Sequence, residues 1–119
     1  MKKIFLSILI LLISFSLFAN GLIHPLDFRG TEKEKQEVID FIKQNVYETY
    51  TAIGMGNPAT LRMMEKEELD CFKKLTLVTN RQLLDEVIDT YCSIDMGSYN
   101  IILMMYEEEL KASKQSLEW

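Results

Sequence analysis

The chain has 119 residues, of which 13 are basic and 18 acidic, and its formal net charge is −5. This length suits one domain, and a hydrophobic content of 48% is enough for a buried core. An acidic chain is repelled by nucleic acid and by anionic membrane surfaces, so the charge argues against both as partners.

The first 19 residues have the pattern of a secretory signal peptide. Two lysines precede an uncharged run, Ile4–Phe18, and Ala19 supplies a small residue at the expected cleavage point. The run is short for a membrane span, although Leu17, three positions before the cut, leaves an uncleaved anchor as the alternative. We expect export to the periplasm or secretion, with a mature chain of 100 residues that keeps 11 basic and 18 acidic groups, a net charge of −7.

After an irregular lead-in, residues 20–30, hydrophobic periodicity predicts only helices. Capping pairs mark the starts of two of them, Thr31 with Glu34 and Thr79 with Gln82. The expected helices cover residues 31 to about 53, 58 to about 78, 79 to about 94 and 99 to about 117.

One stretch of the sequence occurs twice. Val46–Leu69 and Val87–Leu110 align without a gap at an offset of 41, and 11 of the 24 positions are identical. Ordinary residue frequencies would give only about one or two matches. We therefore predict an all-α fold, a small four-helix bundle built from two duplicated helical hairpins, with unit one at about 31–78 and unit two at about 79–119 of a single domain.

Both units use the same residue types at the corner between their two helices. The sequence Ile-x-Met-Gly is followed by Asn57 in unit one and by Ser98 in unit two. We expect Gly56 and Gly97 to adopt the left-handed conformation that ends a helix. We expect Asn57 and Ser98 to cap the helices that follow.

The chain contains two cysteines, Cys71 and Cys92, both in the part expected to be exported. A disulfide between them would close a loop of 22 residues, which the loop-entropy treatment values at roughly 3 kcal/mol. Their spacing lacks CxxC character, so a redox or metal pair is the weaker alternative. We expect one structural disulfide.

Six methionines remain after the signal peptide, and thioether sulfur suits Cu(I). Adjacent methionines on a helix point about 100° apart and cannot chelate one ion together, which favours core packing. We expect no metal site and no cofactor, and we keep periplasmic handling of Cu(I) or a small ligand as the alternative function. The six are Met55, Met63, Met64, Met96, Met104 and Met105.

No set of residues in the chain has the composition of a catalytic site. The acidic runs are interleaved with lysines, which is typical of the solvated face of a helix. His24 is the single histidine, and the chain has no phosphate-binding glycine loop and no HExxH motif. We expect a non-catalytic protein.

The remaining class of function is protein binding. Tyr47, Met63 and Met104 fall outside the core stripes of their helices, where they could form a contact patch. The repeated acids Glu67, Glu68, Glu108 and Glu109 could add to it. We predict an inhibitor, an immunity-type factor or an adaptor in the bacterial envelope. Its partner would be an unknown protein. The acidic charge of the chain favours a basic partner, and a homodimer is the alternative.

Overall fold

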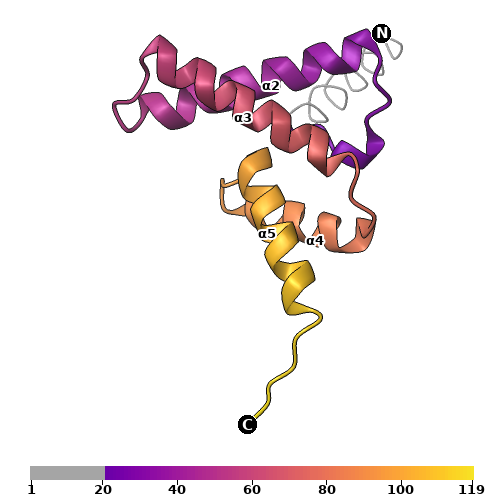
Figure 1. Cartoon of the computed structure of the whole chain (residues 1–119). Coiled ribbons are helices and arrows are strands. Elements are labelled where there is room, and N and C mark those ends of the chain that lie inside the picture. The colour runs from indigo at the N-terminus through magenta and orange to yellow at the C-terminus, as the bar shows by residue number, and fades with distance from the viewer. Residues whose placement is uncertain (1–20) are drawn as a thin grey trace, which may run out of the picture.

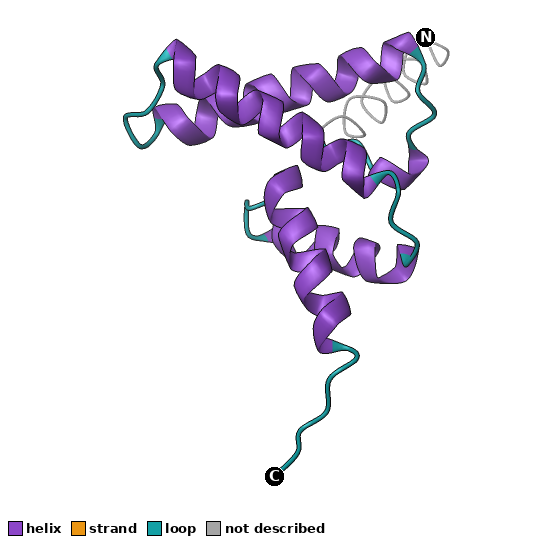
Figure 2. Ribbon diagram, in the orientation of Figure 1, coloured by secondary structure: helices purple, strands orange, loops and turns teal. Residues whose placement is uncertain are grey.

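The computed structural model describes residues 21–119, so the expected signal peptide lies outside the described residues. The prediction of an all-α fold is confirmed for this range, which contains no strand (Figure 2). None of its helices is long and apolar enough to cross a membrane. The elements are the 3-10 turn η1 (Pro25–Asp27) and the helices α2 (Glu32–Thr51), α3 (Pro58–Leu75), α4 (Arg81–Ser93) and α5 (Tyr99–Ala112).

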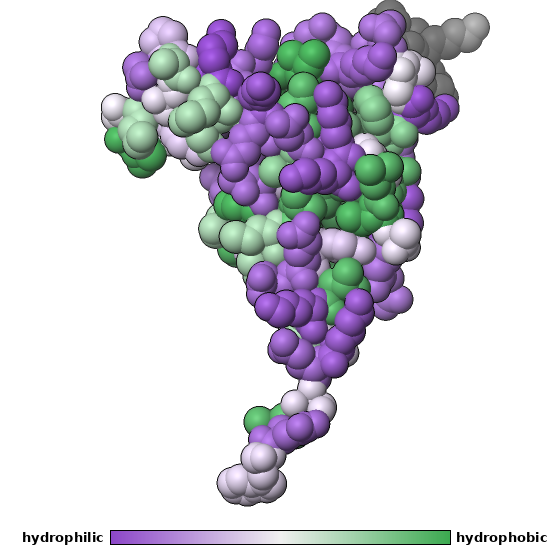
Figure 3. Space-filling model, in the orientation of Figure 1, coloured by the Kyte–Doolittle hydropathy of each residue, from purple (hydrophilic) through white to green (hydrophobic). Residues whose placement is uncertain are grey.

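The helices form a small bundle of two stacked hairpins. Helix α2 pairs with α3, α4 pairs with α5, and the hairpins meet through α3 and α5. Figure 1 shows the α2–α3 hairpin lying across the α4–α5 hairpin, with both corners on the same side of the molecule. Hydrophobic atoms are visible at the α2–α3 corner (Figure 3), where Ile53 and Met55 are exposed.

Tyr99, the first residue of α5, lies at the centre of the core and is fully buried. Its ring packs edge-on against Phe72 of α3 and Phe41 of α2, with centroids 4.9 and 5.5 Å away. Its hydroxyl donates to the carbonyl of Ile23 at 2.9 Å and accepts from the amide of the same residue at 3.1 Å. One side chain therefore joins the lead-in to three helices.

The lead-in crosses from unit one to unit two. His24 contacts Asp85 of α4 at 2.6 Å, and Asp27 pairs with Arg81 of α4 at 2.8 Å. Phe28 then packs edge-on against Phe72 of α3. This segment, expected to be irregular, is therefore held by polar contacts on one unit and aromatic contacts on the other.

Glu68 of α3 connects the two hairpins by capping α5. Its carboxylate is 4% exposed and accepts from the amides of Tyr99 at 2.8 Å and Asn100 at 3.0 Å. The first amides of a helix have no partner within the helix, and a negative charge there also interacts favourably with the helix dipole. Glu68 therefore acts inside the protein, which corrects its assignment to a partner-binding surface.

The two corners are built alike, but not in the way expected. The left-handed residues are Gly54 and Asp95, 41 positions apart, rather than Gly56 and Gly97. Each corner closes with the same 2.8 Å bond, from Met55 to Tyr50 and from Met96 to Tyr91 along the backbone.

Gly56 and Gly97 are required for close approach. A Cβ on Gly56 would lie 2.6 Å from Cγ2 of Thr51, and one on Gly97 would lie 2.6 Å from Sγ of Cys92. Of the expected caps, Ser98 accepts from the amide of Ile101, whereas Asn57 makes no side-chain cap bond.

Several expected helix limits differ from the structure. Thr31 caps α2 as expected, but Asn80, rather than Thr79, caps α4 through the amide of Leu83. The second helix of each unit ends earlier than expected, at Leu75 and Ala112. Ile53 and Ile94 continue the apolar periodicity of α2 and α4, but both are exposed because the helices end before them.

The expected disulfide is absent, since Cys71 and Cys92 are both free. Cys71 faces the core on α3, and Cys92 lies at the α4–α5 corner against Gly97. Helix α3 packs on α2 and α5, and α4 packs on α5, so the hairpin order places the two thiols in different environments. The error came from assuming that helices adjacent in sequence, α3 and α4, would be packed side by side.

We predict that Glu68→Ala lowers the free energy of unfolding by about 1–3 kcal/mol, because two amides at the start of α5 lose their acceptor in a buried site. The matched control is Glu109→Ala, since Glu109 occupies the same repeat position and is exposed. Its effect should stay within about 0.5 kcal/mol. Urea denaturation followed by circular dichroism measures both, and equal losses would contradict the assigned role of Glu68.

We predict that Gly97→Ala destabilises the protein by about 1–3 kcal/mol, because the new methyl group overlaps Sγ of Cys92. Adding Cys92→Ala removes that sulfur and should restore most of the loss. The single variant Cys92→Ala is the control. A double variant no more stable than Gly97→Ala would show that backbone conformation, not close approach, requires the glycine.

Candidate functional site

The apolar residues expected to form a binding patch lie on three different helices. Tyr47, Met63 and Met104 are 58%, 62% and 51% exposed and come from three helices, α2, α3 and α5. The acids are exposed except Glu68; these are Glu67, Glu108 and Glu109. Only Tyr47 among them lines the groove described next.

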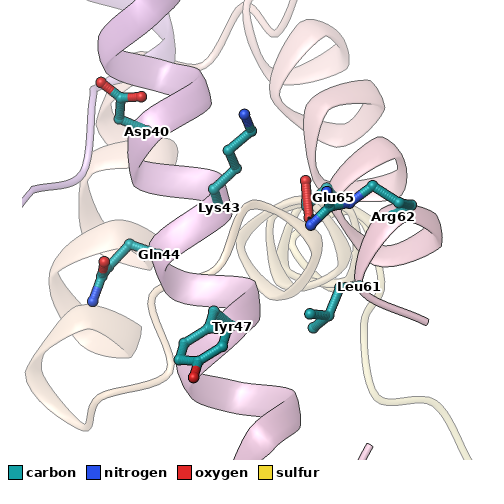
Figure 4. A pocket seen from close by; sticks show the side chains of 7 residues that line it. All are labelled: Asp40, Lys43, Gln44, Tyr47, Leu61, Arg62 and Glu65. Atoms are coloured by element: carbon teal, nitrogen blue, oxygen red, sulfur yellow. Dashed lines mark hydrogen bonds and ion pairs between the residues drawn. The ribbon is translucent and has the colours of Figure 1, made fainter. Parts of the chain in front are cut away.

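A groove of about 500 Å³ runs between α2 and α3 near their corner (Figure 4). Helix α2 presents its residues on one side of the groove and α3 on the other. Figure 4 shows Lys43 and Arg62 extending toward the gap from opposite helices. The lining residues are Asp40, Lys43, Gln44, Tyr47, Leu61, Arg62 and Glu65.

Charge within the groove is only partly paired. The guanidinium of Arg62 binds the half-buried carboxylate of Glu65 at 2.9 Å. Asp40 accepts from the amide of Gln36 at 2.8 Å. Lys43 makes no ion pair with any residue in the range 21–119.

The groove continues along the seam of α2 and α3 as two further hollows. Ile39 and Leu69 form an apolar floor there, and basic side chains stand beside it. Five cations and two carboxylates line the whole seam, although the chain itself is acidic. They are Lys35, Lys43, Arg62, Lys66 and Lys73, with Asp40 and Glu65.

The internal repeat explains why the groove is open. At an offset of 41, the seven lining residues correspond to Arg81, Leu84, Asp85, Ile88, Ile102, Leu103 and Tyr106. Five of these are buried core residues of unit two. Of the seven groove residues of unit one, only Leu61, the counterpart of Ile102, is buried. In unit two this face carries apolar side chains and α5 packs on α3, whereas in unit one the equivalent face is a polar groove.

A second cleft, of about 300 Å³, lies between α2 and the α4–α5 corner and includes Glu68 and Tyr50. Burial raises the pKa of Glu68, and burial together with the charge of Glu68 raises the pKa of Tyr50. Both carboxylate oxygens already accept amides of α5. This cleft therefore joins the two units, and the carboxylate of Glu68 within it is already engaged.

The two methionines of each pair face different environments. Met63 is exposed and Met64 is half-buried on the same helix, as adjacent helical positions require, and Met104 and Met105 repeat this difference. Within residues 21–119, no group of three or more histidine, cysteine, aspartate or glutamate side chains could hold a metal ion.

Sequence reasoning missed Lys43, Arg62 and Glu65 as site residues. Their signal was present in the repeat, at positions that are polar in unit one and apolar in unit two. These residues would be identified by comparing the polarity of equivalent positions, not by counting identities between the units.

Comparison of the chain with protein-family models, with curated proteins and with solved structures finds no match. The two units of the chain are therefore each other's best reference, and their comparison singles out the α2–α3 groove.

We predict a pH dependence of stability from the raised pKa of Glu68. Because the native state binds this proton more tightly than the unfolded state, its contribution is complete below the ordinary pKa of 4.5 and is lost as the pH rises through the raised value. The free energy of unfolding should therefore fall with pH relative to that of Glu68→Gln, by at most about 1.4 kcal/mol per unit. Glu109→Gln, which leaves Glu68 in place, should follow the wild type, whereas parallel profiles for wild type and Glu68→Gln would refute the assignment.

Proposed function

We propose that this chain is an exported helical protein of the bacterial envelope that acts by binding another protein through the α2–α3 groove, as a non-catalytic inhibitor, immunity-type factor or adaptor. The proposed export rests on the N-terminal pattern of two lysines, an uncharged run and Ala19. The proposed mode of action rests on the groove.

The observation that carries the proposal is the difference between equivalent positions of the two units. Unit two places Leu84 and Leu103 in its core where unit one has Lys43 and Arg62 on the groove. Unit one therefore lacks the apolar side chains that unit two buries at these positions. Polar residues that weaken packing are expected where a surface serves recognition.

The groove also has the composition of a recognition surface. Tyr47 offers a large, half-exposed ring, and tyrosine and arginine are the residue types most often responsible for binding energy at protein interfaces. The apolar floor formed by Ile39 and Leu69 lies beside charged side chains, which matches the apolar centre and polar rim of such interfaces.

We predict that a photo-reactive phenylalanine analogue replacing Tyr47 cross-links a specific protein when cells that express the chain are irradiated. The matched control carries the analogue at Met63, which is equally exposed but does not line the groove. Peptide mass mapping identifies the cross-linked protein. A product formed equally from both positions, or from Met63 alone, would place the contact elsewhere.

The groove itself can be closed to strengthen this test. Lys43→Leu with Arg62→Leu installs the residues of unit two, and circular dichroism shows whether the helices are retained. If the proposal holds, this folded double variant no longer forms the cross-link from position 47.

A further inference from the structure

Two hollows of about 380 and 350 Å³ continue the groove along α2 and α3, and they share the half-buried side chains of Ile39 and Leu69 as an apolar floor. We call them the lysine seam, because four lysines and a single carboxylate, that of Glu65, line them. The chain from residue 21 onward has 11 basic and 18 acidic groups, so the lysine seam is a basic strip on an acidic protein. The lysines are Lys35, Lys43, Lys66 and Lys73.

Neighbouring side chains offset only part of this positive charge. Lys35 pairs with Glu32 at 3.1 Å. Glu65 pairs with Arg62 of the groove at 2.9 Å, so its carboxylate does not neutralise the lysines. An apolar floor with a positive rim is complementary to a helix that presents an apolar side chain and carboxylates on one face. The lysines that form this rim are Lys43, Lys66 and Lys73.

The end of α5 has this complementary chemistry. Glu107, Glu108 and Glu109 are consecutive and exposed, and they follow Tyr106, the last buried residue of the helix. Met104 is 51% exposed and lies three and four positions before Glu107 and Glu108, so these three side chains share one face of the helix. The end of α5 therefore presents an apolar side chain beside carboxylates.

Helix α5 cannot bring this face to the lysine seam of its own chain. Glu68 of α3 binds the amides of Tyr99 and Asn100 at the start of α5, and the ring of Tyr99 is fully buried. From this fixed start the helix leads away from the α2–α3 hairpin (Figure 1). Its acidic end can therefore meet a lysine seam only on another molecule.

We infer that the lysine seam binds the exposed face of α5 from a second copy of this chain. Residues 35–43 span about 12 Å along α2 and residues 104–108 about 6 Å along α5, so the seam is long enough for this contact. Met104 covers the apolar floor, and the glutamates face the lysines. Lys111 follows one turn later and leaves the end of α5, residues 104–112, with a net charge of −2.

The net negative charge of the chain opposes self-association at a distance. Salt at physiological concentration screens this repulsion beyond about 8 Å, so the charges in direct contact decide whether two copies associate. This contact uses Lys66 and Lys73, which do not line the groove around Tyr47, and it is therefore separate from the proposed partner site.

The test is analytical ultracentrifugation of the purified chain over a range of concentrations, where a mass above that of one chain is expected. Lys66→Glu with Lys73→Glu, and separately Glu107→Lys with Glu108→Lys, should each lower the association constant at least about tenfold, because like charges then face each other. An equimolar mixture of these two double variants should associate again, because the acidic seam of one meets the basic α5 of the other. The matched control, Glu86→Lys with Asp89→Lys on the exposed side of α4, should leave the association unchanged.

Three results would overturn the inference: a single-chain mass at every concentration, association that survives either double variant, or variants whose association the mixture does not restore. Circular dichroism of each variant shows that its helices are retained. Cross-linking of a cellular protein from position 47 is expected even in the Lys66→Glu, Lys73→Glu variant. If that cross-link forms while self-association is absent, the proposed function stands and only this inference fails.

Discussion

The structure depends on one buried carboxylate. Glu68 lies on the last turns of α3 and binds the first two amides of α5, so it fixes where α5 begins relative to the first hairpin. The contact is costly, as the raised pKa shows, because the charge is removed from water. It is retained because the unpaired amides of a buried helix start would also be costly. With α5 fixed in this way, Tyr99 enters the core, and its hydroxyl in turn orders the lead-in.

Duplicated segments usually keep their core and vary their surface, and this chain has varied both. Glu68 is buried whereas Glu109, its repeat counterpart, is exposed. Phe72 and Leu75 of α3 face the second unit, and their counterparts at the end of unit two are serines. A repeat that lies at the end of a stack needs a polar outer face, and these changes give unit two such a face. The other open face, at the α2–α3 groove, is also polar, but it surrounds a hollow and includes the ring of Tyr47.

The helices and their number could be predicted from hydrophobic periodicity, because each helix buries one continuous stripe. The likeness of the two corners could also be predicted, but the role of Gly97 could not: its proximity to Cys92 is a distance between atoms, and no local pattern encodes it.

The prediction of a disulfide failed for a related reason, since the pairing of helices depends on how whole hairpins stack. Glu68 looked like one more acid in a solvated run, and only the three-dimensional structure distinguishes it from Glu67 beside it. For the groove, the sequence contained the necessary contrast between Lys43 and Leu84, but its meaning required knowing that Leu84 is buried.

The bond between Tyr99 and Ile23 joins residues 76 positions apart in the sequence. Helical repeat proteins usually fold through contacts between neighbours, so that one unit can form and the next can add to it. Here the lead-in of unit one is completed only when the first helical turn of α5 is in place, and the core of unit two is completed only when the lead-in covers it. Contacts of this range slow folding because a long loop must close before they contribute. The chain therefore combines the architecture of a repeat protein with the all-or-none folding of a small globular domain, and neither hairpin is expected to persist alone during or after its synthesis.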